Sequence, residues 1–253
     1  MKKLITLAAA LVLVTGASAQ SSWRMGVTLG AFGNHSQFSG GMQNASALFT
    51  QNPYGTGGIG VLFRKTLNAH LSFQTGLNFG SMGFEYGMAG NYNLTHPFSH
   101  YTLSRASAGT AAIPATLIWN FNPNCKNVRW FVGGGLSLVM HGDYHSNDPA
   151  GADLGPNITN GYFKQTVTSN TNTALNGHVM GGVEKLLKKG GMISLALYLN
   201  RGFAPMATSN VVYAVDNTVY NHTFRNYNNY AGLTLTYYFK NFKGGAKPTT
   251  ITK

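Results

Sequence analysis

HLSFQTGLNF, residues 70–79, alternates between two kinds of side chain with a period of two. The odd positions carry Leu, Phe, Thr, Leu and Phe on one face of an extended chain, and the even positions carry His, Ser, Gln, Gly and Asn on the other. Such a strand covers the core of a soluble sandwich, or it turns its apolar face to lipid and encloses its polar face in a lumen. The stretch therefore predicts a β-strand, and the rest of the chain has to decide its surroundings.

Seven further segments show the same alternation, each close to the roughly 9 to 11 residues that a tilted strand needs to cross a bilayer. Glycine is frequent inside them, which weakens a soluble strand but suits a curved, closed barrel wall. The seven segments are WRMGVTLGAF from Trp23, GGIGVLFR from Gly57, AAIPATLIWNF from Ala111, VRWFVGGGLSLVM from Val128, LNGHVMGGVEK from Leu175, MISLALYLNR from Met192 and YAGLTLTYYF from Tyr230.

The connections between the eight segments alternate between short and long. The second, fourth and sixth segments are followed by KTLNA, NPNCKN and LLKKGG, and the others by long polar stretches rich in Asn, Ser, Gly and Tyr. Transmembrane barrels have tight periplasmic turns and long outside loops, whereas only some soluble sandwiches, such as antibody-like domains, gather long loops at one end. The pattern predicts an all-β fold, an eight-stranded antiparallel up-and-down transmembrane β-barrel with four long extracellular loops, among them 81–110, 141–172 and 202–229.

In lipid every backbone donor and acceptor must be paired, so the first strand is expected to close against the last. We expect the alternate apolar residues of the strands to face the bilayer. This set is Met25, Val27, Leu29, Ile59, Val61, Phe63, Leu71, Phe73, Leu77, Phe79, Ile113, Leu117, Val132, Leu136, Leu138, Ile193, Leu195, Leu197, Leu233 and Leu235. A belt of aromatic residues is expected at the periplasmic membrane interface. Its predicted members are Trp23, Trp119, Trp130, Tyr237 and Phe239.

The first residues have the pattern of a secretory signal peptide. Two lysines precede the apolar run 4–14, and the small residues of TGASA follow it at the positions that a signal peptidase reads. We therefore expect a signal peptide over 1–19 with Sec-type export and cleavage after Ala19, a barrel over 20–240 and a basic periplasmic tail over 241–253. The expected location is the cell outer membrane.

The composition points to a membrane surface and away from nucleic acid. Charged residues make up 9% of the chain, against the roughly 25% usual in soluble domains. The formal charge is +12, but there is no Lys/Arg cluster, zinc spacing or aromatic–basic motif, so a nucleic-acid partner is not expected. Anionic headgroups, including those of lipopolysaccharide, are the expected counter-charge. Cys125 is the single cysteine and is predicted to be a free thiol.

Four stretches, IPATLIWNF, FVGGGLSLVM, GHVMGGVEK and the closing YAGLTLTYYF, carry a resemblance to a known family. There the chain resembles the small outer-membrane β-barrel domain family of Gram-negative bacteria, often labelled PorT-like. Members share a strand with Ile-Pro before alternating aliphatics, matched by Ile113-Pro114, then a Gly-rich strand and a terminal strand that ends in an aromatic residue. The family's last strand often ends the protein, whereas this chain continues from Asn241 to Lys253.

Strand parity also predicts a polar network inside the periplasmic third of the lumen. Ionisable groups buried there are costly unless they pair, so Glu184 is expected to lie among arginines with Tyr238 near by. The predicted network consists of Arg24, Arg64, His70, Arg129, Glu184 and Tyr238, with His178 higher in the lumen. A network that fills and stiffens a narrow barrel is the expected role. The surplus of positive charge leaves open a bound anion or lipid phosphate.

No catalytic, cofactor or metal site is predicted. A lipid hydrolase needs Ser, His and an orienting acid within hydrogen-bond reach. His70 and Ser72 share a face without an obvious acid, and the His35-Ser36 and His145-Ser146 pairs point apart in an extended chain. The spacing of Asp143, Asp148 and Asp153 does not match a calcium loop.

The function that we expect from the sequence is therefore non-enzymatic. The first hypothesis is an outer-membrane barrel that has a structural role in the envelope or binds a protein or ligand partner through its extracellular loops. The alternatives are an enzyme that modifies lipopolysaccharide or another lipid, and a narrow anion-preferring pore, which a filled lumen disfavours.

Overall fold

The computed structural model describes residues 23–38, 49–52, 54–90, 99–122, 125, 128–147, 162–188, 190–215 and 218–239. Both the expected signal peptide (1–19) and the expected tail (241–253) lie outside these ranges. Among the described residues there is no helix with the length and apolar character to span a membrane.

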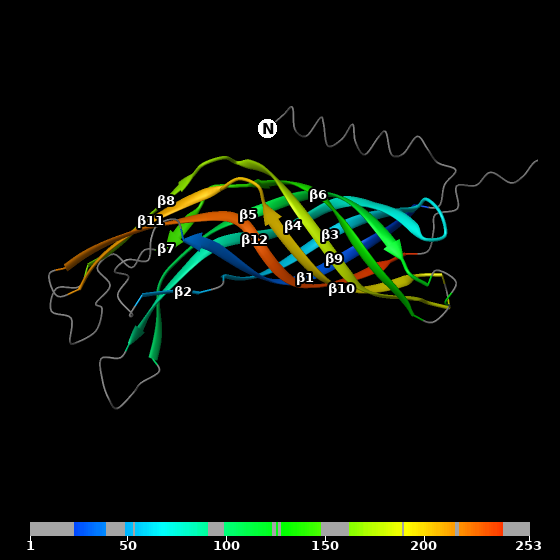
Figure 1. The fold of residues 1–253 in the computed structure, drawn as a ribbon, viewed down its shortest axis with the longest axis horizontal. Helices are drawn as coiled ribbons and strands as arrows, with labels where there is room; N and C mark the ends of the chain where they lie inside the picture. The colour runs from blue at the N-terminus through cyan, green and yellow to red at the C-terminus, as the bar shows by residue number, and fades with distance from the viewer. Residues whose placement is uncertain are drawn as a thin grey trace, which may run out of the picture.

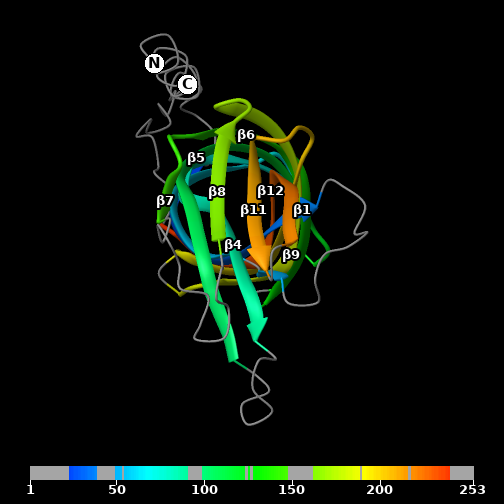
Figure 2. The same cartoon turned by 90° about the vertical axis from the view of Figure 1, so that its left-hand side faces the viewer.

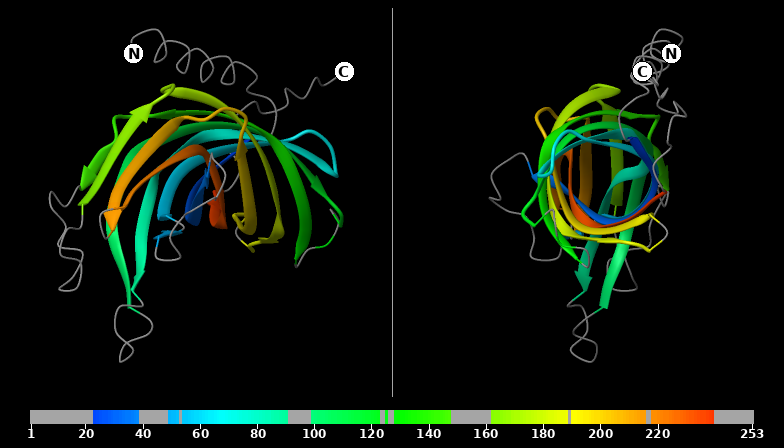
Figure 3. Two further views of the ribbon diagram at one scale, coloured as in Figure 1. Left: turned by 60° about the vertical axis from the view of Figure 1, so that its left-hand side comes forward. Right: turned by 90° about the vertical axis from the view of Figure 1, so that its right-hand side faces the viewer.

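Eight strands form one closed antiparallel ring around a central lumen (Figures 1 and 3). Each strand pairs with the next in the chain, and the ring closes where Leu29 lies opposite Leu235. The prediction of an eight-stranded up-and-down barrel is confirmed, with all eight segments in their expected order. The strands are β1 (Trp23–Phe38), β3 (Tyr54–Thr66), β4 (Leu71–Gly90), β5 (Ser99–Asn120), β6 (Arg129–His141), β9 (Thr173–Leu186), β10 (Met192–Gly202) and β12 (Thr218–Tyr238).

The wall alternates between apolar outward and buried inward side chains, as β10 illustrates. Leu195 and Leu197 are 46% and 52% exposed, whereas the alternating Ser194 and Ala196 are buried. Every residue expected to face the bilayer is exposed or half-buried, and none is buried. An apolar outer surface on a closed ring of paired strands satisfies both demands of the hydrocarbon region, since no backbone edge is left open at the closing seam. The chain is therefore a membrane-spanning β-barrel.

The expected outside loops are in large part β-sheet, which corrects the prediction for 81–110, 141–172 and 202–229. The barrel strands continue beyond the apolar band, and four short strands join them, so that a sheet projects from one end of the barrel (Figure 2). Outside the membrane neither face of a strand has to be apolar, so these segments lack the period-two signal. The four added strands are β2 (Phe49–Asn52), β7 (His145–Asn147), β8 (Tyr162–Ser169) and β11 (Ala207–Val215).

Glycines on the inner wall allow the strands of this narrow barrel to approach each other closely. A Cβ added at Gly135 of β6 would lie 1.9 Å from the carbonyl oxygen of Ala115 on β5, far inside van der Waals contact. At Gly33, by contrast, an added Cβ meets no atom within 4 Å. Gly135 is therefore required by packing, and Gly33 is not.

Replacing Gly135 with alanine should lower the free energy of unfolding by about 1–3 kcal/mol, the range for overpacked sites. Gly33→Ala is the matched control and should change it by less than about 0.5 kcal/mol. Urea titration of both variants in lipid bilayers measures the difference. Equal stabilities would show that the β5–β6 contact at Gly135 is not tight.

Candidate functional site

The end of the lumen nearest the short turns, predicted to be periplasmic, contains a buried ion pair that crosses it. Arg64 Nη1 on β3 donates to Glu184 Oε2 on β9 at 2.6 Å, and the two side chains are 5% and 1% exposed. Because β4, β5 and β6 separate these two strands in the sheet, the pair bridges the interior rather than two neighbours. Arg64 Nη2 also lies 3.5 Å from Asn120 Oδ1. The pair fixes one strand against a distant one across the barrel.

Other side chains surround this pair and fill the lumen. The hydroxyl of Tyr238 donates to Gln74 Oε1. Arg24 lies close enough to Glu184 to interact electrostatically, and it contacts the sulfur of Met192. Arg129 Nε donates to the carbonyl of the half-buried Cys125. Leu62 packs against Met192 and Tyr238 in a buried cluster. This end of the lumen is thus occupied by charged and apolar side chains together.

His70 does not join the network around Glu184. Its ring stacks on Trp119 with centroids 5.2 Å apart, and Nδ1 donates to the carbonyl of Asn120 at 3.0 Å. The reason is that β4 begins at Leu71, which leaves His70 in the turn, where strand parity no longer sets the direction of a side chain.

The aromatic residues expected in the interface belt lie at the strand ends near the short turns. Trp119 and Trp130 are 47% and 60% exposed, and Tyr237 and Phe239 are also exposed. Trp23 is half-buried, with the ammonium of Lys65 5.8 Å from its ring centroid.

Midway along the lumen, His178 is held between two hydroxyl groups. Its Nε2 lies 2.8 Å from Thr116 Oγ1 and its Nδ1 lies 2.9 Å from Ser137 Oγ. The ring stacks on Tyr198, which in turn stacks on Tyr230. Both ring nitrogens are hydrogen-bonded to hydroxyls, so neither donates to an orienting carboxylate of the kind that a hydrolytic triad uses. The serine and threonine partners were not predicted, although they share the inward parity of His178.

The pairs considered for hydrolysis are not assembled as a catalytic site. Ser72 is buried in the lumen, whereas His70 is turned toward Trp119. His145 and Asp143 are exposed near the outer end of β6, and the side chains of Ser146 and of His35-Ser36 lie outside the described residues, as do Asp148 and Asp153. Within the described ranges no group of three or more His, Cys, Asp or Glu side chains is arranged to hold a metal ion.

The opposite end of the lumen, next to the projecting sheet, is filled by apolar side chains. Met82, Val139 and Met206 are fully buried and form one cluster with Ala174. Beside Met82 of this cluster, Asn226 Nδ2 on β12 donates to the carbonyl of Gly83 on β4 at 2.9 Å. Between this apolar plug and the ion-paired plug at the other end, the described residues leave a space.

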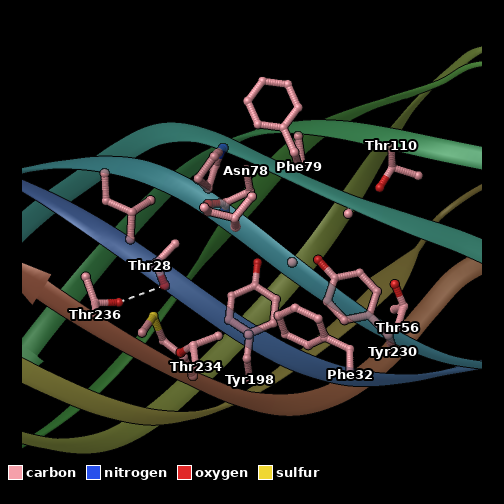
Figure 4. A pocket seen from close by; sticks show the side chains of 18 of the residues that line it. Thr28, Phe32, Thr56, Asn78, Phe79, Thr110, Tyr198, Tyr230, Thr234 and Thr236 are labelled. Carbon is pink, nitrogen blue, oxygen red and sulfur yellow. Dashed lines mark hydrogen bonds between the residues drawn. The ribbon is translucent and has the colours of Figure 1, made fainter.

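That space is a cavity of about 80 Å³ in the middle of the barrel (Figure 4). All of its lining residues are uncharged, and hydroxyl groups dominate its polar surface. Phe32, Tyr198 and Tyr230 gather on one side, with Phe32 edge-on to both tyrosine rings. The hydroxyl-bearing Ser and Thr residues of the lining are Thr28, Thr56, Ser81, Thr110, Thr116, Ser194, Thr234 and Thr236.

Comparisons with known proteins find similarity in architecture. No family model matches the chain, and no curated protein matches it in sequence. Among solved structures it is similar to the outer membrane protein OprG from Pseudomonas aeruginosa, at 9% identity and a TM-score of 0.48, over 88% of this chain and 98% of that one. It is also similar to the outer membrane protein AlkL, at 12% identity and a TM-score of 0.37, over 90% and 94% of the two chains.

A third similar structure is the Escherichia coli outer membrane protein W, at 12% identity and a TM-score of 0.36, over 87% of this chain and 99% of that one. All three are outer-membrane proteins by their descriptions. Identities this low bear on the arrangement of strands and not on any activity. The chain is a membrane β-barrel whose likeness to these proteins is one of architecture.

Proposed function

We propose that this chain is a non-enzymatic outer-membrane barrel, of the PorT-like type that its strand motifs resemble, and that it binds an anionic partner through its extracellular sheet. The observation that carries the proposal is the contrast between the two parts of the molecule. Charged and apolar plugs close the lumen, while the outer strands continue as a hydrogen-bonded sheet beyond the apolar band. A barrel built in this way offers its outer surface, and not a passage, to other molecules.

The charges of the projecting sheet favour an anionic partner. Lys164 on β8, Arg201 on β10 and Arg225 on β12 are exposed. Arg105 on β5 is already paired with Glu85, with Nε and Oε2 3.4 Å apart. The first three side chains are thus available at the level where the phosphates of lipopolysaccharide surround the outer part of a barrel, and phosphate is a ligand that arginine binds well.

The enzyme and pore alternatives find less support in the geometry. His178, the histidine buried beside a serine, has both nitrogens occupied by hydroxyls. A continuous water path through the barrel would have to pass Arg64 and Glu184 at one end and the buried Met82 and Met206 at the other. We therefore place the function on the outside of the barrel.

Binding of fluorescent lipopolysaccharide to the protein in vesicles of uncharged lipid tests this proposal. The triple variant Lys164→Ser, Arg201→Ser, Arg225→Ser should bind roughly 10- to 100-fold more weakly, because each basic side chain near a charged membrane surface contributes about 1 kcal/mol at most. Lys185→Ser, at the end of β9, with Lys188→Ser, in the turn that follows it, is the control and should bind like the wild type.

Three results would contradict the proposed function. Equal binding by the triple variant and the wild type would remove the role of the basic sheet. Released or transferred acyl chains after incubation with lipopolysaccharide would favour an enzyme. Single-channel steps of the wild type in a planar bilayer would show that the lumen is open.

A further inference from the structure

On the extracellular side of Ile59 and Phe79, the ladder between β3 and β4 is interrupted. The β3–β4 pairing runs from Thr66 opposite Ser72 up to Ile59 opposite Phe79, and there it stops. On the same edge of β4, the next pairing is with β2, where Glu85 lies opposite Asn52. Between these points, residues 55–58 and 80–83 form no ladder with each other, although each segment remains paired on its other edge with β1 or β5. Here β3 and β4 contact each other through side chains.

Glycines make the wall thin at this place. Gly57 and Gly58 of β3 lie beside Gly80 of β4, and the strands remain close, because a Cβ added at Gly80 would lie 3.5 Å from the carbonyl oxygen of Gly57. On the lumen side, the ring of Phe32 lies 3.0 Å from a Cβ added at Gly58. A side-chain contact joins the two strands, with Thr56 Oγ1 2.6 Å from Ser81 Oγ. Immediately below, Ile59 and Phe79 are 54% and 51% exposed on the lipid-facing surface. The unpaired segment therefore borders the apolar band of the barrel.

The central cavity lies directly behind this segment. It is lined by Gly58, Gly80, Thr56 and Ser81, and also by the outward-facing Ile59 and Phe79; Thr56 and Phe79 are labelled in Figure 4. The lining therefore includes residues that belong to both faces of the wall. Among the described residues, the ion-paired plug and the apolar plug close the two ends of the lumen. Within this part of the chain, the remaining route to the cavity is the glycine-containing segment between β3 and β4.

The lining defines the chemistry of what fits inside. It is uncharged and rich in hydroxyls, which excludes an ionic head group because a buried charge without a partner is costly. The side-chain oxygen of Asn78, a lining residue, is buried and has no hydrogen-bond partner, so an acceptor is free for a hydroxyl donor. A volume of about 80 Å³ corresponds to roughly five to eight water-sized positions, which is the size of a glycerol group.

We propose that the segment between β3 and β4 is a lateral entrance from the bilayer, and that the cavity binds the uncharged, hydroxylated head group of a single-chain amphiphile. The hydroxyls of the head group meet Asn78 and the threonines of the lining, and the ring of Tyr198 provides an apolar surface for its carbons. The acyl chain remains outside, along Ile59 and Phe79, in contact with lipid. This inference is independent of the proposed binding by the extracellular sheet.

The test uses a disulfide that closes the entrance reversibly. In a Cys125→Ser background, Thr56→Cys with Ser81→Cys places two sulfurs where the two hydroxyl oxygens lie 2.6 Å apart, so oxidation joins β3 to β4. The protein in lipid nanodiscs is exposed to a monoacylglycerol that carries a photoreactive diazirine beside its glycerol group. Peptide mass spectrometry then locates the labelled residues.

We expect lumen residues such as Thr110 and Tyr230 to be labelled at least tenfold more in the reduced protein than in the oxidised protein. In the Cys125→Ser parent, neither oxidant nor reductant should change the labelling. Asn78→Leu, which needs no cross-link to form, should also reduce lumen labelling several-fold. Equal lumen labelling of the oxidised and reduced forms, or label confined to the outer apolar surface, would overturn the proposal. Lumen labelling by a phosphatidylcholine with the same photoreactive group would overturn the assignment of an uncharged head group.

Discussion

Replacing Leu195 with arginine is expected to lower the free energy of unfolding by about 2–4 kcal/mol, the cost of a basic side chain at the bilayer midplane on the lipid face of a barrel. Leu195 lies on the outer surface of β10, 46% exposed, and is opposite Val183 on one neighbouring strand and Leu235 on the other. It therefore sits in the middle of an apolar stretch of wall. Denaturant titration in lipid bilayers measures the change.

The matched control is Val219→Arg. Val219 is a large hydrophobic residue with even greater exposure, 68%, but it lies at the outer end of β12, where it pairs with Ala214 of β11 in the projecting sheet. In contact with water an arginine there should change stability by less than about 0.5 kcal/mol. If the two variants lost the same small amount, Leu195 would face water, and the membrane-spanning interpretation of the barrel would be wrong.

The contrast between these two positions also explains which strands were predictable. Along β10, lipid requires every outward residue to be apolar, so MISLALYLNR carries a clear period of two. Unpaired backbone groups are also too costly in hydrocarbon, so the sheet has to close. The pairing of β1 with β12 could therefore be predicted once the strands were identified. In β11 and the outer half of β12 no such requirement acts, and stretches such as VYNHTFRN are indistinguishable from polar loops.

The sequence predicted which side chains point inward and that Glu184 lies among arginines, as it does beside Arg64, but not which arginine it binds. Parity placed Arg64 and Glu184 in the lumen, but their pairing across the barrel depends on the registers of β3 to β9, which alternation alone leaves undetermined. The same holds for His178 and its partner Ser137. The interrupted ladder beside Gly58 could likewise not be predicted from the sequence, because inward and outward residues alternate through YGTGGIGV as they do in a fully paired strand.

Removing the carboxylate of the buried ion pair should be the most destabilising single change. Glu184→Gln keeps the shape of the side chain but leaves Arg64 without a counter-charge, with Arg24 and Arg129 close enough to add repulsion. Breaking a buried pair by neutralising one partner typically costs about 3–5 kcal/mol, because the remaining charge is neither solvated nor compensated. Denaturant titration in bilayers should show this loss, with no comparable effect from Glu85→Gln, whose partner Arg105 is half exposed.

The double variant Arg64→Met with Glu184→Leu separates charge from packing. Apolar side chains of similar size remove the desolvation cost of both ions, and such replacements are often neutral or stabilising by about 1–4 kcal/mol. We therefore expect the double variant to be at least as stable as the wild type, although each single change is strongly destabilising. If the double variant lost as much as Glu184→Gln, the contribution of these residues would come from their hydrogen bonds to the surrounding lumen, such as that to Asn120, and not from the burial of an uncompensated charge.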